Sequence, residues 1–343
     1  MQEAPPATEP LPPVERVRPG IWSIPVPLPI VLRYVLVYAF ETDDGVYIID
    51  AGWNTDDAYD ALDRGLLRAG YAMTDVKGVM VTHIHADHYG LAGRIREKSG
   101  AWVALHPADA ALLQDRYQEP EDLLEQMGKF LRRLGAPASE IEELRNASMP
   151  VRQFVEVAHP DVLLRDGQHP EVAGWDLTAV WTPGHSPGHL CFWEPTNKVM
   201  FTGDCVLPRI TPNVSLNPQT GDDPLGDYLR SLDRIAAYDG EGFPAHEWRF
   251  GSLRDRTREL KDHHEHRFAE VVAAIEGGCS TAWEITPRMT WSRPWDETTQ
   301  FARRSAISEA LAHLRTLEVR GVVRELFGEP SRWVLTAGRS ART

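Results

Sequence analysis

The sequence predicts an α/β fold followed by a smaller, helix-rich segment. Short apolar runs typical of strands recur through the first 251 residues, at 76–81, 162–164, 177–181, 190–193 and 199–201. Between them, the spacing of apolar residues predicts helices over 57–70 and 227–238. Strands that alternate with helices in this way predict a mixed sheet with helices packed on its faces.

Length and composition set the expected domain boundaries. The chain has 343 residues, a net charge of −14 and 42% hydrophobic residues, which is enough for a sizeable core. We expect a disordered, Pro-rich tail at 1–16, a larger domain at 17–251 and a C-terminal domain at 252–343. The tail lacks the basic and apolar parts of a signal peptide. Only three widely spaced cysteines occur, which favours a cytoplasmic protein without a disulfide framework.

Residues 21–40 are the one stretch whose apolar content approaches that of a membrane span. Several prolines and an arginine interrupt it, so we expect no spanning helix and no membrane partner. Alternating apolar residues followed by the acidic turn at 41–45 predict the first β-hairpin instead. We expect the Pro-rich part, 25–29, to form a loop near the mouth of the functional site.

The densest group of polar side chains follows the strand predicted at 76–81. His83, His85, Asp87 and His88 lie within six residues of one another. Histidines two apart on an extended chain point the same way, so His83 and His85 can hold one cation together. A turn after His85 would bring Asp87 and His88 to a second position close by. The string predicts a metal site in preference to a chance His-rich turn.

Three further ligand-type residues, His185, Asp204 and His246, each end an apolar, strand-like run. Gly or Pro interrupts the strand just before each of them, which places the polar residue on a loop at a sheet edge. Seven ligands that converge from four such edges are what a dinuclear metal site requires.

The order His-x-His-x-Asp-His, then His, then Asp, then His resembles the metallo-β-lactamase-fold hydrolase superfamily over about residues 17–250. The resemblance implies a four-layer αβ/βα sandwich that binds two zinc ions per chain, with iron or manganese as alternatives. By position, the implied ligands are His83, His85 and His185 for the first ion, Asp87, His88 and His246 for the second, and Asp204 for both. Asp87 and Asp204 are also the implied catalytic residues, and Asp50 and Thr82 are candidates for orienting the imidazoles.

Two positions depart from the family pattern. Ala245-His246-Glu247 stands where the last motif usually reads Gly-His-Gly or Gly-His-Asp, and Cys205 follows Asp204. We expect Cys205 to be a spectator. His85 separates the chain from the redox-active flavodiiron branch, and Asp204 separates it from the true β-lactamases. A mononuclear iron enzyme of the sulfur dioxygenase kind stays open.

The C-terminal segment has a different character from the rest of the chain. Its pattern predicts helices at 253–275, 281–284 and 299–317, and a hairpin from 322–327 and 332–336. Three helices and a two-stranded wing resemble the winged-helix-like tail of the β-lactamase-like-protein-2 branch, whose members include endoribonucleases.

Charge argues against nucleic acid as the main partner. Residues 252–343 carry a net charge of +2, which leaves −16 on residues 1–251. Phosphate binding needs a positive field, and Arg303, Arg304 and Arg315 with Glu309 beside them offer only a small patch. We expect the tail to serve in packing or in a homodimer contact, with nucleic-acid binding as the alternative.

Two helical features lie outside the metal motif. Residues 108–146 have helical apolar spacing and are long for a connection, so a packed layer and a lid over the site both stay open. His263, His264 and His266 form a second histidine group on a predicted helix, and we expect it to be structural. His106 and His189 are expected to be structural or to support the metal ligands.

The implied chemistry is metal-dependent hydrolysis. In the implied mechanism, a metal-bridging hydroxide attacks the carbonyl of an ester, thioester or lactone in a small-molecule substrate. The acidic charge of residues 1–251 favours this over phosphodiester cleavage in RNA, which the tail supports as the second interpretation. A DNA-binding regulator without enzymatic activity is the third, and the complete ligand set argues against it.

Overall fold

The larger of two facing sheets begins at the N-terminus. The structure of the chain, a computed structural model, describes residues 10–336. Seven strands lie in chain order across this sheet. They are β1 Glu15–Arg18, β2 Ile21–Pro27, β3 Tyr34–Thr42, β4 Gly45–Ile49, β5 Val76–Met80, β6 Trp102–Leu105 and β7 Val162–Leu163. The first four strands pair antiparallel, and β4 to β7 pair parallel. The parallel strands β4 and β5 therefore end at the same edge, from which the first polar motif departs.

A second sheet packs face to face with the first. Its order is β11 Glu241–Pro244, β10 Val199–Gly203, β9 Leu190–Glu194 and β8 Thr178–Trp181. Between the sheets, Tyr38 and Phe40 of β3 meet Phe201 of β10 and Phe243 of β11, with ring centroids 4.9–5.6 Å apart. These aromatic contacts fix the spacing of the two sheets and hence of the loops at their common edge.

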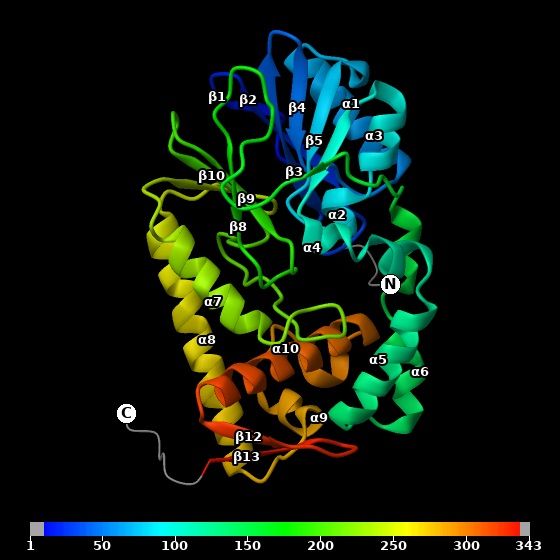
Figure 1. Cartoon of the computed structure of the whole chain (residues 1–343), viewed down its shortest axis with the longest axis vertical. Helices are drawn as coiled ribbons and strands as arrows, with labels where there is room; N and C mark the ends of the chain where they lie inside the picture. The colour runs from blue at the N-terminus through cyan, green and yellow to red at the C-terminus, as the bar shows by residue number, and fades with distance from the viewer. Residues whose placement is uncertain (1–9, 337–343) are drawn as a thin grey trace.

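Helices cover the outer face of each sheet, which gives four layers (Figure 1). On the first sheet, α1 Asp56–Ala69 and α3 Ala92–Ser99 bury Leu62, Leu66 and Ile95. On the second, α7 Pro224–Ile235 and α8 Leu253–Glu276 bury their apolar faces in another core cluster. The predicted helix at 57–70 is confirmed, because α1 ends at Gly70 in the left-handed conformation.

The segment between β6 and β7 is a series of short helices in place of one long one. They are α4 Pro107–Ala110, the π-helical turn η2 Gln114–Gln118, α5 Glu121–Leu134, α6 Ala138–Asn146 and the 3₁₀ segment η3 Met149–Phe154. Pro120, Gly135 and Pro137 stand at the breaks, since proline and a left-handed glycine end helices. The segment packs against the C-terminal part, where Arg303 Nη1 donates to Glu140 Oε2 at 2.9 Å.

The C-terminal segment contains the predicted helices and hairpin. After α8 come α9 Ala282–Ile285, α10 Gln300–Val319, β12 Val323–Leu326 and β13 Arg332–Leu335. The capping box that the sequence predicts is present at Thr281 and Glu284. Ile307 and Leu311 of α10 share one core cluster with α7 and with β8 to β10. The segment is therefore packed onto the second sheet's helical layer.

Two expectations near the N-terminus need correction or restriction. The loop predicted at 25–29 is wrong in part, because β2 continues through Pro27. Proline is tolerated there because β1 pairs only with residues 21–23, which leaves that side of β2 unpaired. Most of the predicted tail, residues 1–9, lies outside the described residues, and β1 already begins at Glu15. No helix within residues 10–336 is long and apolar enough to cross a membrane.

The C-terminal hairpin offers a direct test of this shared core. Trp333 is 1% exposed and Phe327, at the turn, is 80% exposed. Trp333→Ala should lower the free energy of unfolding by about 3–5 kcal/mol, because a large buried side chain leaves a cavity. Phe327→Ala, the matched control, should change it by less than about 0.5 kcal/mol. Urea unfolding measures both, and equal effects would contradict the packing described.

Candidate metal centre

The edge formed by β4 and β5 places the first four candidate ligands. After β5 the chain turns through a short loop that carries His83 and His85 into α2 Ala86–Tyr89, which carries Asp87 and His88. Histidines on the loop and an acid with a histidine on the first helical turn thus face a common space. His83 and His88 are fully buried, so these ring nitrogens do not face solvent.

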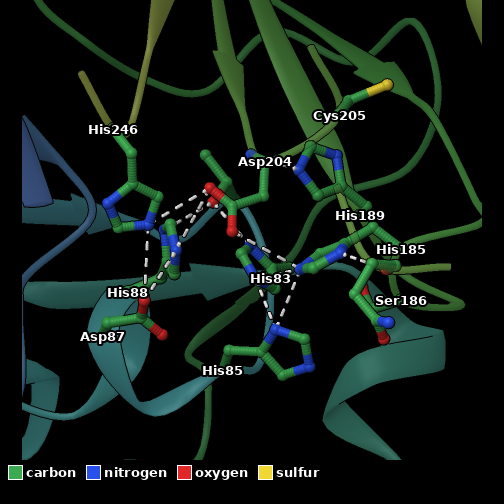
Figure 2. Close-up of polar contacts among 12 residues, drawn as sticks. His83, His85, Asp87, His88, His185, Ser186, His189, Asp204, Cys205 and His246 are labelled. Atoms are coloured by element: carbon green, nitrogen blue, oxygen red, sulfur yellow. Dashed lines mark hydrogen bonds and ion pairs between the residues drawn. The ribbon is translucent and has the colours of Figure 1, made fainter. Parts of the chain in front are cut away.

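The second sheet supplies the other three. His185 lies on the loop between β8 and β9, Asp204 directly follows β10, and His246 follows β11. Gly203, just before Asp204, has φ +48°, and a Cβ there would lie 2.7 Å from His189 Nε2 and 2.9 Å from Thr82 Cβ. Only glycine fits at this close approach of the two sheets. The structure thus brings all seven predicted residues together (Figure 2).

Three histidines form the first group. His83 Nε2 lies 2.9 Å from His85 Nδ1 and 3.2 Å from His185 Nε2, and the last two nitrogens are 3.0 Å apart. Burial lowers the pKa of His185 to about 4 and, with the neighbouring imidazoles, holds those of His83 and His85 well below their usual range. These imidazoles are therefore neutral near pH 7 and offer lone pairs, which metal coordination requires.

Asp87, His88 and His246 form the second group. His88 Nε2 and His246 Nε2 lie 3.6 Å and 3.4 Å from Asp87 Oδ2. Both nitrogens are buried and have no hydrogen-bond partner within the described part of the chain. Burial raises the pKa of the Asp87 carboxyl, but the charges of His88 and His246 outweigh it and bring that pKa to about 2. Buried polar atoms that lack partners are costly, so these atoms point to a missing ligand.

Asp204 lies between the two groups. Its Oδ1 is 3.4 Å from His246 Nε2 and 3.6 Å from His88 Nε2, whereas its Oδ2 is 3.6 Å from His185 Nε2. Oδ1 is buried and without a hydrogen-bond partner among the described residues. Each carboxylate oxygen therefore faces a different group, as Figure 2 shows.

The protein orients four of the five imidazoles from behind. His185 Nδ1 lies 2.8 Å from the Asn213 carbonyl, and His246 Nδ1 lies 2.8 Å from the Tyr34 carbonyl. His88 Nδ1 lies 2.8 Å from Asp50 Oδ2, and His83 Nδ1 lies 3.0 Å from Thr82 Oγ1. Since carbonyl and carboxylate oxygens only accept, Nδ1 carries the proton and Nε2 is free to coordinate.

Asp50 is the centre of this supporting network. It follows β4 with φ +64°, and its Oδ1 accepts from the Thr82 backbone N–H at 2.8 Å. The Thr82 hydroxyl lies 3.0 Å from both of its carboxylate oxygens. One carboxylate thus ties the end of β4 to the loop after β5 and holds His88. The sequence assigned Asp50 and Thr82 this role, and the contacts are consistent with it.

Two supporting residues could not be found from the sequence. Asp109 is fully buried, and its carboxylate accepts from Ile84 N at 2.9 Å, Ser186 Oγ at 2.8 Å and Gly188 N at 2.6 Å. It joins the loops that carry His83, His85 and His185. Asn213 is held in turn by α10, because its Nδ2 donates to Glu309 Oε2 at 3.1 Å. Neither residue belongs to a motif, and only the fold brings it near.

The remaining polar candidates have structural surroundings. His189 Nε2 accepts from Asp204 N at 3.1 Å, and His106 caps α4. The Cys205 sulfur is directed away from the ligands (Figure 2). His264, from the second histidine group, is buried against His313, with 3.1 Å between ring nitrogens. His313 was not singled out in the sequence, because its partner lies 49 residues away.

These residues fit a metal centre. Neutral imidazole nitrogens and carboxylate oxygens from seven residues converge, and three of those atoms are buried without partners. Nitrogen and oxygen donors of this kind suit zinc, iron or manganese. A two-sheet α/β sandwich with such a cluster at its strand ends defines a metallohydrolase.

The comparison with known families agrees. The model of the "Metallo-beta-lactamase superfamily" matches residues 30–241, so the chain belongs to this superfamily and is a metal-dependent hydrolase. A metallo-beta-lactamase family protein from Thermus thermophilus is 33% identical, with a TM-score of 0.80 over 94% of this chain and 100% of that one. A beta-lactamase domain protein from Burkholderia ambifaria is 27% identical, with a TM-score of 0.81 over 96% of this chain and 97% of that one. Both alignments extend beyond the family model.

Curated relatives include further hydrolases. The probable metallo-hydrolase YqjP of Bacillus subtilis is 26% identical over 275 residues, which are 78% of this chain and 84% of that protein. An atrochrysone carboxyl ACP thioesterase of Aspergillus fumigatus is 32% identical over 122 residues. That match spans only about a third of either chain.

Asp50→Asn tests the supporting network. An amide in place of the carboxylate can present N–H to His88 Nδ1 and would favour the wrong tautomer. We expect metal affinity of the second group to fall by about ten- to a hundredfold while the fold is kept. Competition with a chelator of known affinity measures this. Unchanged affinity would exclude Asp50 as the residue that orients His88.

The Glu309 carboxyl gives a pH-dependent prediction. Burial raises its pKa to about 7, and the charge of Arg267 only partly offsets this. The stability that it contributes is thus fully present below the ordinary value of 4.5 and is lost as the pH rises to about 7. Relative to Glu309→Gln, the wild type should lose on the order of 2–3 kcal/mol between about pH 4.5 and 7. Urea unfolding across this range measures the difference, and a constant gap would contradict the shift.

Proposed function

We propose that the chain is a dinuclear zinc hydrolase that cleaves the carbonyl bond of an ester, thioester or lactone. The division of the Asp204 oxygens between the two ligand groups carries this proposal. Zinc is the metal that we propose, since an all-nitrogen and oxygen set with neutral imidazoles suits it. The finding that the chain is a metal-dependent hydrolase is the starting point.

Each ligand group has a distinct role in the proposed reaction. His83, His85 and His185 would hold one ion, Asp87, His88 and His246 the other, and Asp204 both. When bound, the two ions supply Lewis acidity and a water whose pKa is lowered towards neutrality. Asp87 would orient the attacking water by accepting its hydrogen bond, because its low pKa keeps the carboxylate charged. No Ser, Cys or Lys nucleophile is needed.

Thioesters are our first choice of substrate. The fungal thioesterase supports this choice, although its similarity covers only part of each chain. The net charge of −16 on residues 1–251 also favours a small substrate over a long polyanion. A cytoplasmic location accords with the three free cysteines, Cys191, Cys205 and Cys279.

Cleavage of RNA is the competing proposal, because three helices and a hairpin in the C-terminal segment have a winged-helix-like layout. The contacts of its cations weigh against it. Arg303 pairs with Glu140, and Arg315 pairs with Glu318 and Glu325. Paired cations add little to a phosphate-binding field. We propose that the segment acts in packing or in a homodimer contact, and the same cations argue against a DNA-binding regulator.

Asp204→Asn tests the bridging role. The amide keeps the shape but removes the negative charge that would face both ions. Turnover should fall by about two orders of magnitude or more, and the second ion should be held more weakly. The fold should survive, because the aromatic core between the sheets is untouched. Unchanged rate with unchanged metal content would exclude the bridge.

A substrate panel separates the two hydrolase proposals. Purified protein would be assayed with a thioester, a lactone and a single-stranded RNA at low and physiological salt. A carbonyl hydrolase should turn over a small thioester with little dependence on salt, whereas RNA binding should weaken steeply as salt rises. RNA turnover with such a salt slope, and none of the thioester, would replace the proposed function.

A further inference from the structure

Three donor side chains from separate segments gather beside the first histidine group. Arg116 lies on η2, Gln219 on the loop between β10 and α7, and Arg304 on α10. Arg116 Nη1 donates to Gln219 Oε1 at 3.2 Å. Burial lowers the pKa of Arg304 to about 10, and the charge of Arg116 contributes to this shift. Two like charges are therefore near enough to influence one another.

The position of Arg116 is fixed by its neighbours. The Tyr117 hydroxyl donates to the Ile84 carbonyl at 2.7 Å, and Ile84 stands between His83 and His85. Arg152 Nη2 donates to the carbonyls of Tyr117 and Gln118 at 2.8 Å and 2.9 Å. After burial and His185, the charge of Arg116 is the next cause that lowers the pKa of His85. Arg116 is thus held close to the first ligand group.

The nearby carboxylates are already engaged elsewhere. Arg303, next to Arg304, takes Glu140 at 2.9 Å, and Arg145 takes Glu142 at 2.8 Å. Within residues 10–336, Arg116 and Arg304 have no carboxylate partner. The partly buried guanidiniums accordingly lack the anion that such groups normally require.

Gln219 adds an independent sign of a missing acceptor. Its Oε1 accepts from Arg116, which turns its Nε2 away from that guanidinium. Nε2 is buried and has no hydrogen-bond partner in the described part of the chain. An unsatisfied buried amide donor beside two unpaired cations fits a ligand that accepts hydrogen bonds and carries negative charge.

We propose that Arg116, Gln219 and Arg304 form a subsite for an oxyanion of the substrate, which makes the enzyme selective for anionic esters or thioesters. This inference rests on the proposed hydrolase function. A carboxylate on the acyl part fits best, because Arg116 is near enough to His85 for its charge to act there. Guanidinium groups match a planar carboxylate and can donate two hydrogen bonds to it.

The competing explanation is that Arg304 only caps a helix. Its Nη1 donates to the carbonyls of Leu144 and Arg145, near the C-terminal end of α6. Both distances are 3.4 Å, which is long for a hydrogen bond from a charged donor. A capping role predicts lost stability without a change in substrate preference, so the two explanations give different results.

Matched substrates test the subsite. The S-glutaryl and S-(methyl glutaryl) thioesters of N-acetylcysteamine differ in one negative charge. A second pair, S-acetylpantetheine with and without its 4′-phosphate, places the charge on the leaving thiol. The metal-loaded wild type should prefer the charged member of at least one pair by about tenfold or more in kcat/KM. Preference in the first pair places the oxyanion on the acyl part, and preference in the second alone places it on the thiol. Equal rates within both pairs would overturn the proposal.

Variants assign the preference to these residues. Arg116→Gln and Arg304→Gln should each reduce kcat/KM for the charged substrate by about tenfold or more, chiefly through KM, and leave the neutral one within about twofold. Arg116→Lys should restore part of the preference. Arg303→Gln, the matched control on α10, should leave it unchanged, because that cation already has Glu140. A double variant that is fully metal-loaded and keeps the wild-type preference would overturn the proposal.

A binding measurement separates failure of the subsite from failure of the hydrolase proposal. Glutarate should raise the melting temperature of the metal-loaded wild type more than glutaramide does, and this difference should vanish in Arg116→Gln/Arg304→Gln. The result holds even if no thioester is hydrolysed, in which case only the proposed function is lost. Equal stabilisation of wild type and double variant by glutarate would show that the anion binds elsewhere.

Discussion

The burial of bare ligand atoms at the meeting edge of two sheets is the constraint on which the rest of the structure depends. Unpartnered nitrogens of His88 and His246 and an oxygen of Asp204 are held out of solvent in one small volume of the described structure. Such atoms are costly unless a cation satisfies them. The aromatic layer between the sheets, the glycine approach at residue 203 and the Asp50 carboxylate all hold them in place against that cost. Stability and function thus meet at one point in the fold.

The sequence allowed the ligands to be predicted because each sits where a strand pattern ends. His83, Asp204 and their partners needed only the alternation of strand and loop and the spacing of polar residues. Asp109, Asn213 and His313 could not be predicted, since their roles arise from contacts between segments far apart in the chain. The Pro-rich loop was wrong in part, because proline is permitted where a strand has an unpaired side. The helical insertion was predicted too long, although Pro120 and Pro137 already marked its breaks.

The C-terminal segment is linked to the site by contacts that sequence patterns do not reveal. Glu309 of α10 holds Asn213, whose carbonyl faces His185, and Arg304 of the same helix lies near Arg116. The helix therefore reaches a metal ligand through one hydrogen-bond path and the substrate side through another. This arrangement explains why the segment shares a core with the second sheet's helices (Figure 1). Its role is one of support and recognition close to the metal centre.

The central claim is that the seven side chains hold two ions, with Asp204 between them. Anomalous diffraction at the zinc edge, on crystals of protein purified without chelator, tests it most directly. Two peaks should appear, one among His83, His85 and His185 and the other among Asp87, His88 and His246, with a separate Asp204 oxygen beside each. A single fully occupied peak that is strongest at the iron edge, with Asp204 bound on one side only, would contradict the account and assign the enzyme a mononuclear iron site.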